Sequence, residues 1–425
     1  MLAINEAMSQ WVRKTQSTVG RGAPVTDLFG FRRRAVDFPL HVWGARIDKE
    51  MEKRLPESSE RLVASGIGDT WDQARAGALG EAMERYSFAL LDEVLERLEW
   101  EPPSRKTTVR QLFDFPFLLP RTRSRQKWAK EAAHSPIRYL SAKRIMPDGK
   151  QHNERIPVEV IINDERFNIF TTTNGMACGV TLEDATKRAL KEVIERDALM
   201  LVWLTRTAGI SLSKENVLNT EYCKWIDRAA VRGIRSILKD ISTGHGYKVV
   251  LAGLIHEKKD GNRILSLGAG ADLRLNLAAE HAFREACLGW KGMAWRSELG
   301  KESSKSEDVP ANFAQHLMRY TRSDQYPEVA FLFEEDEDAI DEGDENIQIN
   351  EDVFHDLAPF VIDITPPDIK TIGAVVVKVV ISGLVPLTFA DLQCDEMAAA
   401  RLPVSIGGIR VSNGTILNDK PHPWP

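Results

Sequence analysis

The segment TWDQARAGALGEAMER at residues 70–85 returns in outline as TLEDATKRALKEVIER at residues 181–196. Both copies follow the pattern Ala-x3-Ala-x2-Glu-x2-Glu-Arg, and its first half occurs again from Ala278 to Glu285. Thr70 and Thr181 open the two full copies, where the N-cap of a capping box or of a close variant belongs. The repeat therefore predicts helices of one design, the first two beginning just after a glycine-bearing turn.

Short apolar stretches rich in β-branched residues surround these helices. They are VEVIIN (158–163), KVVLAGLI (248–255), RILSLGAGAD (263–272) and GAVVVKVVISGL (373–384). Their length and composition are typical of strands. We therefore expect a mixed α+β fold in which β-sheets are flanked by the repeated helices.

The composition is that of an ordinary globular protein, and it excludes several classes of function. The 425 residues include 56 Lys and Arg against 62 Asp and Glu, a net charge of −6, so nucleic acid is not an expected partner. The sequence shows neither a signal-peptide pattern nor a long uncharged apolar run. These features predict a cytoplasmic protein that does not contact a membrane.

The common metal and hydrolase motifs are missing. The sequence contains no P-loop, no HExxH and no GxSxG, and Gly268-Ala-Gly270 lacks the third glycine of a dinucleotide loop. No CxxC pair exists, which argues against a zinc site and a disulfide framework and favours reduced, mostly buried thiols at Cys178, Cys223, Cys287 and Cys394.

Charge and proline content suggest how the chain is organised. We expect an N-terminal segment at 1–60 and a catalytic domain at 61–425 that includes a proline-rich tail at 421–425. The strongly acidic stretch 334–346 cannot bury enough apolar surface to order itself, so a solvated loop is favoured over a docking surface. The basic run FRRRA at 31–35 is likewise expected to be a solvated face.

The repeated pattern places small and acidic residues on one face of each helix, because residues three and four apart share a face. The small residues are expected to leave open space that a ligand could fill. Two glutamate pairs follow them, and two converging pairs of carboxylates need a cation, for which Mg²⁺ is the natural choice. The candidate metal ligands are Glu81, Glu84, Glu192 and Glu195.

A simpler interpretation is available for each copy. Glu81 with Arg85 and Glu192 with Arg196 could be ordinary surface ion pairs, each worth about 0.3–0.5 kcal/mol. A single copy would favour that interpretation. The duplication, with the same alanines and the same glycine and threonine entry, favours a functional site instead.

Taken together, several segments resemble the YcaO family, whose members use ATP to modify the amides of peptide backbones. The matching segments run from residue 65 to the C-terminus: SGIG (65–68), ALGEAMERYS (78–87), TTTNGMACGVTLEDATKRALKEVIERDA (171–198), AAEHAFREA (278–286), SGLVPL (382–387) and PHPWP (421–425).

The resemblance implies an ATP and Mg²⁺ site on the glycine turn and the repeated helices. The residues that it implies for ATP are Ser65, Gly66, Gly68, Glu81, Glu84, Arg85, Asp184, Glu192, Glu195, Arg196, His281 and Glu285, with the four glutamates named above for the metal. The chain departs from the family pattern at Ile67 (usually Lys), Ala78 (often Ser), Val180 (often Asn), His281 (usually Gln) and Ser382 (usually Pro).

The ending PHPWP resembles the PxPxP tail of azoline-forming members. That resemblance implies a catalytic role for Pro421, Pro423 and Pro425, with the terminal carboxylate placed near the reacting amide. The fixed φ angle of proline fits such a role, because a stiff tail holds its end in place at low entropic cost. A disordered proline-rich end is the simpler alternative.

These features predict an ATP-dependent cyclodehydratase that converts Cys, Ser or Thr residues of a ribosomal precursor peptide to thiazoline or oxazoline rings. Thioamide or amidine formation within the same family, or a non-catalytic nucleotide-binding scaffold, are the alternatives. We expect the first 60 residues to be too short for a leader-binding module, so a partner related to E1 or ThiF enzymes is expected. A flavin-dependent dehydrogenase and a homodimer are further candidate associations.

Overall fold

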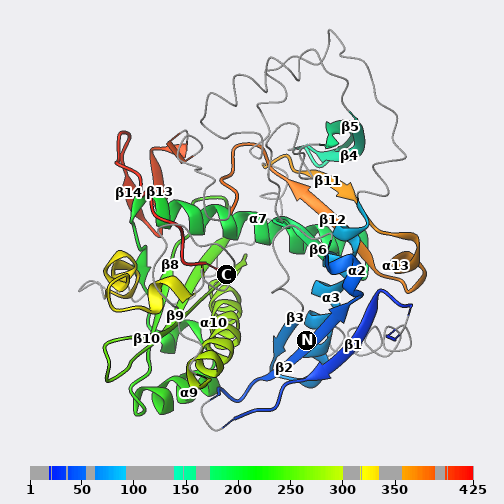
Figure 1. Cartoon of the computed structure of the whole chain (residues 1–425). Coiled ribbons are helices and arrows are strands. Elements are labelled where there is room, and N and C mark those ends of the chain that lie inside the picture. The colour runs from blue at the N-terminus through cyan, green and yellow to red at the C-terminus, as the bar shows by residue number, and fades with distance from the viewer. Residues whose placement is uncertain are drawn as a thin grey trace.

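Antiparallel sheets, each covered by a long helix that carries the repeat, form the framework of the protein (Figure 1). In this view α7 crosses the middle, with β11 and β12 above it and α10 with β8 to β10 below it. The expected α+β class is confirmed. The computed structural model describes residues 19–20, 22–34, 37–53, 63–91, 138–146, 148–158, 173–299, 316, 318–334, 357–387, 398–399 and 401–424.

All strand pairs between named strands are antiparallel. The first sheet has the order β1–β2–β3, with β1 at Val25–Gly30, β2 at His41–Ile47 and β3 at Ala64–Gly68. The second has the order β5–β4–β11–β12–β6, with β4 at Tyr139–Ile145, β5 at Gln151–Pro157, β6 at Met176–Gly179, β11 at Phe360–Asp363 and β12 at Val375–Val380. The third has the order β10–β9–β8–β7, with β7 at Ile210–Ser211, β8 at Arg235–Asp240, β9 at Lys248–Glu257 and β10 at Arg263–Asp272. A hairpin joins β13 at Val404–Ile406 to β14 at Ile409–Val411.

The long helices begin where the repeat predicts. Thr70 caps the first with a full capping box, and the Thr181 hydroxyl accepts a hydrogen bond from the Asp184 N–H at the start of the second. The long helices are α3 at Trp71–Ala89, α7 at Leu182–Thr205 and α10 at Leu275–Glu298. The shorter ones are α2 at Lys49–Glu52, α8 at Lys214–Val217, α9 at Thr220–Ala230, α13 at Pro367–Thr371, and the 3-10 turns η3 at Arg319–Thr321, η4 at Tyr326–Glu328 and η5 at Ala330–Phe333.

The alanines of the repeat pack against glycines of the strand that precedes each helix. A Cβ atom added to Gly66 of β3 would lie 2.1 Å from the Ala74 carbonyl oxygen of α3. One added to Gly268 of β10 would lie 2.5 Å from the Ala282 carbonyl oxygen of α10. The repeat alanines, Ala74, Ala78, Ala185, Ala189, Ala278 and Ala282, are completely buried. The expected open space above the helices is therefore filled by strands, and the small residues serve close helix–strand contact.

The first sheet spans the boundary that was expected between residues 60 and 61, because β2 pairs with β3. The segment before residue 60 thus shares a sheet with the segment after it. Of the acidic stretch 334–346, only Glu334 lies within the described residues, and of VEVIIN only Val158 does. The expected strands at 248–255, 263–272 and 373–384 are present as β9, β10 and β12.

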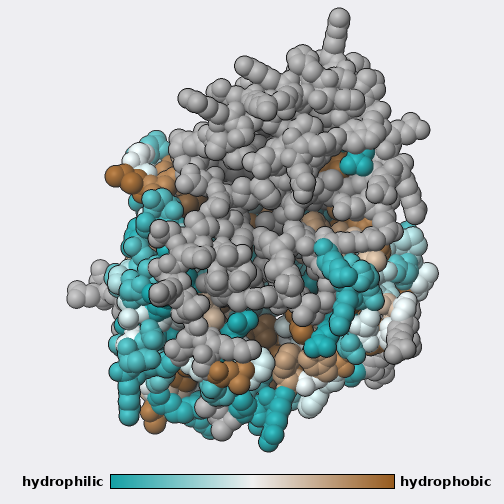
Figure 2. Space-filling view, viewed as in Figure 1, coloured by the Kyte–Doolittle hydropathy of each residue, from teal (hydrophilic) through white to brown (hydrophobic). Residues whose placement is uncertain are grey.

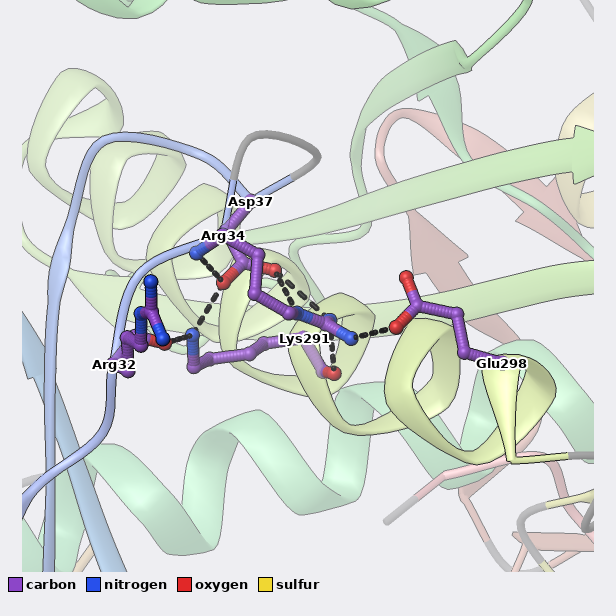
Figure 3. A network of polar contacts seen from close by, with 5 residues as sticks. All are labelled: Arg32, Arg34, Asp37, Lys291 and Glu298. Carbon is purple, nitrogen blue, oxygen red and sulfur yellow. Dashed lines mark hydrogen bonds and ion pairs between the residues drawn. The ribbon is translucent and has the colours of Figure 1, made fainter.

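A buried ion-pair network fastens the loop between β1 and β2 to α10 (Figure 3). The Asp37 side chain, 3% exposed, accepts hydrogen bonds from Arg34 and Lys291, and Arg34 also donates to Glu298 at 2.7 Å. Arg32 is exposed, as expected for a solvated basic face, whereas Arg34 is drawn into the network. The network therefore fixes α10 relative to the first sheet.

The described surface mixes hydrophilic areas with smaller hydrophobic ones (Figure 2). Exposed apolar side chains such as Trp71 and Trp295 are scattered along it. Among the described helices, none combines the length and the apolar character needed to cross a bilayer.

Substitution of Gly268 by Ala should destabilise the protein by about 1–3 kcal/mol, because the new Cβ atom must push β10 away from α10. Gly292, on the exposed face of the same helix with nothing within 4 Å, is the matched control. Gly292→Ala should instead stabilise by about 0.5–1 kcal/mol, since glycine weakens a helix interior. Chemical denaturation measures both, and equal effects would contradict the close-contact role.

Candidate active site

The acidic residues of the repeated helices converge, although they are far apart in sequence. Glu84 of α3 lies close enough to Glu192 of α7 for the negative charge of Glu192 to raise the pKa of Glu84. The negative charge of Glu285 of α10 likewise raises the pKa values of Glu192 and Glu195. The fold thus brings carboxylates from all of the repeat copies into one region.

Hydrogen bonds from strand N–H groups hold these carboxylates in place. The Ser65 N–H donates to Glu81 at 2.6 Å, and the Ala269 N–H donates to Glu285 at 3.3 Å. Ser65 lies in β3 and Ala269 in β10, both edge strands, whose outer N–H groups have no neighbouring strand to bond. The repeat glutamates therefore accept hydrogen bonds from otherwise unpaired N–H groups at the strand edges, in addition to carrying charge.

Glu84 makes the corresponding contact to a different sheet. The Cys178 N–H of edge strand β6 donates to the Glu84 carboxylate at 2.7 Å. This bond links α3, from the first repeat copy, to the strand that precedes α7 in the second copy. It fixes the two copies relative to each other at the point where their carboxylates meet.

Burial and mutual repulsion make these carboxylates hard to ionise. Burial, followed by the charge of Glu192, raises the pKa of Glu84 to about 8. Burial also raises the pKa of Glu192 to about 7, although nearby Arg196 and Lys378 act against it. The pKa of Glu195, which is 5% exposed, is raised well above its ordinary value by burial and by Glu285. Such a cluster attracts cations.

The arginines of the repeat lie beside the cluster. Arg85 pairs with Glu81, and Arg196 Nε lies 3.8 Å from Glu192. These pairs are half-buried, with 17% and 20% of the arginine side chains exposed. The Glu183–Lys187 pair on the outer face of α7 is 77% and 54% exposed, which is the environment that a surface ion pair would have. The burial of the repeat pairs favours a functional site over ordinary surface ion pairs.

Arg196 is available to an anionic ligand. Its Nε is buried and has no hydrogen-bond partner among the described residues. A guanidinium in this state is suited to bind phosphate, because it can donate several hydrogen bonds in one plane. The donor set therefore fits a ligand that brings both phosphates and a cation.

The glycine turn contributes mainly through its backbone. Gly66 and Gly68 lie in β3 beneath α3, where an added Cβ atom would meet the helix. Asp184 accepts a hydrogen bond from the Val180 N–H at 3.3 Å and pairs with Arg188 at 3.0 Å, so it closes the turn before α7.

His281 and Glu285 lie together on α10, with 3.9 Å between His281 Nε2 and the Glu285 carboxylate. Two of the departures from the family pattern have a packing explanation. Ile67 packs among the apolar residues of α9 and α10, and Ala78 is completely buried beneath β3.

Two buried charged residues in this region were not predicted. Asp197, directly after the second copy, is fully buried; it accepts hydrogen bonds from the Val385 N–H at 2.8 Å and from Arg401 at 2.9 Å. Lys378 lies fully buried in β12, and its positive charge lowers the pKa of Glu192. The available signals were a charge inside the apolar run VVVKVV and an aspartate that only the second copy carries after its arginine.

The tail is anchored at the C-terminal end of α7. Trp203 Nε1 donates to the Lys420 carbonyl at 2.7 Å, and the Tyr320 hydroxyl donates to the Pro421 carbonyl. Trp424 is 1% exposed and belongs to the main hydrophobic core. Residues 421–424 are therefore packed rather than a disordered end, and Pro425 lies outside the described residues.

The anchor and the carboxylate cluster lie on the same face of α7. Arg196 and Trp203 are seven residues apart, which is close to two full turns, or about 10 Å along the helix axis. A tail held at Trp203 thus starts near the charged cluster. This placement is compatible with the expected role of its terminal carboxylate.

The carboxylates of this region fit an Mg²⁺ ion that is shared with the phosphates of a bound nucleotide. Within the described part of the chain, no three Asp, Glu, His or Cys side chains form a ready-made metal cluster. Mg²⁺ in phosphate-binding sites commonly uses only one or two carboxylates and completes its shell with phosphates and water. The paired glutamates and the buried arginine match that arrangement.

Without metal and nucleotide, the stability of the protein should fall as the pH rises from about 5 to about 8. Glu84 and Glu192 have folded-state pKa values of about 8 and about 7 against an ordinary 4.5, so the folded state binds more protons than the unfolded state in this interval. Glu84→Gln should flatten the fall, because an amide oxygen still accepts from the Cys178 N–H but does not ionise. Melting temperatures in EDTA across this range measure the slope. An unchanged slope in Glu84→Gln, alongside the exposed control Glu183→Gln, would contradict the raised pKa of Glu84.

Comparison with known proteins places the fold. A heterocyclase solved in complex with substrate and cofactor superposes with a TM-score of 0.68 at 19% identity, over 98% of this chain and 57% of that chain. The chain thus spans little more than half of that heterocyclase. The E. coli microcin synthetase McbBCD complex with pro-MccB17 bound matches with a TM-score of 0.63 at 16% identity, over 94% of this chain and 96% of the other.

Two further proteins are also similar. YcaO from Methanopyrus kandleri, bound with AMPPCP and Mg²⁺, matches with a TM-score of 0.56 at 18% identity, over 89% of this chain and 90% of that one. An uncharacterized protein of Methanothermobacter thermautotrophicus is 25% identical over 347 residues, 76% of this chain and 81% of that protein. Residues 65–385 match the family described as YcaO cyclodehydratase, ATP- and Mg²⁺-binding. The chain belongs to the YcaO family, and ATP and Mg²⁺ are its cofactors.

Proposed function

We propose that the protein is an ATP-dependent cyclodehydratase that forms thiazoline or oxazoline rings in a ribosomal precursor peptide. The observation that carries this proposal is the joint placement of a carboxylate and arginine cluster and an anchored proline-rich tail on α7. The heterocyclase and microcin synthetase likenesses support the fold for such a role.

The chemistry begins at a Cys, Ser or Thr side chain of the peptide, whose sulfur or oxygen gives up its proton to water as it attacks the preceding carbonyl carbon. The resulting oxyanion takes the γ-phosphoryl group of ATP, and ADP leaves. Phosphate then departs as the amide nitrogen loses its proton and the ring C=N bond forms. Each ring consumes one ATP, and the oxygen atom of the original carbonyl leaves as part of the released phosphate.

The residues of the site divide this work. Glu81, Glu84, Glu192 and Glu195 hold Mg²⁺, which when bound offsets negative charge on the phosphates. Arg85 and Arg196 orient the phosphates through charge-assisted hydrogen bonds. The remaining ATP contacts come from the glycine turn, with Ser65, and from Asp184, His281 and Glu285.

The tail supplies the base in this proposal. Trp424, packed in the core, fixes the direction of the chain end, and Pro421 and Pro423 stiffen it. The carboxylate of Pro425 then accepts the amide proton. This assignment favours ring formation over thioamide or amidine formation, which do not require such a tail in the family resemblance described above.

The proposed partners are the precursor peptide and an E1- or ThiF-like protein that recognises its leader. The McbBCD neighbour is itself a multi-protein synthetase complex. A flavin-dependent dehydrogenase would oxidise the rings afterwards. The proposed location is the cytoplasm, where ATP is available.

Glu81→Gln and Glu192→Gln should each lower peptide-dependent ATP turnover by at least about 100-fold. The fold should persist, because glutamine can still accept the backbone N–H bonds that Glu81 receives from Ser65 and Glu192 from Gly175. Glu183→Gln, on the exposed face of α7, is the matched control and should be fully active. Phosphate release with and without peptide measures turnover. Wild-type rates in either site variant would restore the surface ion-pair interpretation, and ATP turnover that ignores peptide would favour a scaffold.

A short extension after Pro425 should abolish ring formation while leaving the melting temperature and ATP binding near wild type. The added residues displace the terminal carboxylate but keep Trp424 in the core. Trp424→Ala, by contrast, should destabilise the protein by about 3–5 kcal/mol through a core cavity. The loss of one water mass per ring, followed by mass spectrometry of the peptide, measures cyclisation. Full cyclisation by the extended protein would refute the catalytic tail.

A further inference from the structure

One peptide unit connects a buried lysine to a carboxylate of the site. The Lys378 ammonium donates to the Asn174 carbonyl at 3.0 Å. The N–H of the same peptide bond, that of Gly175, lowers the pKa of Glu192 through hydrogen bonding. The turn packs directly against α7 beside Glu192, because a Cβ atom added to Gly175 would lie 2.7 Å from Val193 Cγ2. A positive charge and a negative charge thus bind opposite ends of one amide dipole.

The turn that presents this peptide tolerates only glycine at its second position. Gly175 has a φ of +73°, and an added Cβ atom would lie 2.3 Å from the Val379 carbonyl oxygen. Gly175 also accepts from the Val379 N–H at 2.7 Å, next to Lys378 in β12. The Asn174 side chain donates to the Leu387 carbonyl at 2.7 Å. The 174–175 peptide is therefore held from several sides.

We propose that Lys378 is a positioning residue for the Mg²⁺·ATP site, acting on Glu192 through the Asn174–Gly175 peptide. The inference rests on the role proposed above for Glu192. Lys378 does not contact the ligand in this scheme; it polarises the amide and so strengthens the hydrogen bond that orients the carboxylate. Residues that orient metal ligands from behind typically contribute about 10- to 100-fold to metal affinity.

The burial of Lys378 makes a purely structural role an unattractive explanation. A fully buried ammonium costs several kcal/mol of desolvation, and apolar residues of similar volume commonly replace buried charges without loss of stability. Lys239 of β8, 1% exposed, offers the comparison, because it is a buried lysine in a different sheet. Its substitution reports the general effect of losing a buried lysine.

The test titrates Mg²⁺ against Lys378→Met, with Lys239→Met as the matched control. Binding of a non-hydrolysable ATP analogue, measured by calorimetry in EDTA and at increasing Mg²⁺, separates metal from nucleotide. Lys378→Met should raise the half-saturating Mg²⁺ concentration by about 10- to 100-fold and leave binding in EDTA unchanged. Lys239→Met should leave the Mg²⁺ dependence as in the wild type.

The outcomes are distinct. An unchanged Mg²⁺ requirement in Lys378→Met, with Glu192→Gln strongly impaired, would overturn this inference alone. Wild-type Mg²⁺ dependence in Glu192→Gln would overturn the proposed role of Glu192 and this inference with it. Should Lys378→Met fail to fold, Lys378→Gln, whose amide can still donate to Asn174, must show an intermediate increase in the Mg²⁺ requirement, and no increase would also overturn the proposal.

Discussion

The repulsion between carboxylates gathered from three helices is the constraint on which the site depends. The charge of Glu192 raises the pKa of Glu84, and the charge of Glu285 raises the pKa values of Glu192 and Glu195, in an environment that already disfavours ionisation. The fold tolerates this cost because strand N–H groups bind several of these carboxylates and buried cations face them. A bound cation with its phosphates would relieve the repulsion, so ligand binding and stability are coupled.

Close contact between small residues makes that gathering possible. Gly66 and Gly268 allow the strands to approach the alanines of α3 and α10 to backbone distance. At that spacing the glutamate one turn after the second alanine reaches the edge of the strand. In the alanine–glutamate pattern, the packing of the alanines thus determines the position of the glutamate carboxylates.

Much of the local structure was predictable from sequence, because capping and helical periodicity act over a few residues. Thr70 and Thr181 cap their helices as expected, and the repeat correctly predicted helices of one design. The prediction that the alanines leave open space for a ligand was wrong, because the sequence does not show which strand covers a helix. Lys378 was missed for the same reason: its partner peptide at Asn174 is more than 200 residues away.

The arrangement also explains why α7 is central to the proposed chemistry. Its first turns carry Asp184, its middle carries Glu192, Glu195 and Arg196, and its end holds the tail through Trp203. A rigid helix keeps these groups at fixed spacing, whereas separate loops would allow them to move independently. Because phosphoryl transfer depends mainly on positioning, a base held on the same helix as the phosphate ligands needs no large motion to meet the peptide amide. The tail with its buried Trp424 is held at the end of α7, and the proposed role of the Asn174–Gly175 peptide concerns Glu192 in its middle, so both depend on the geometry of this one helix.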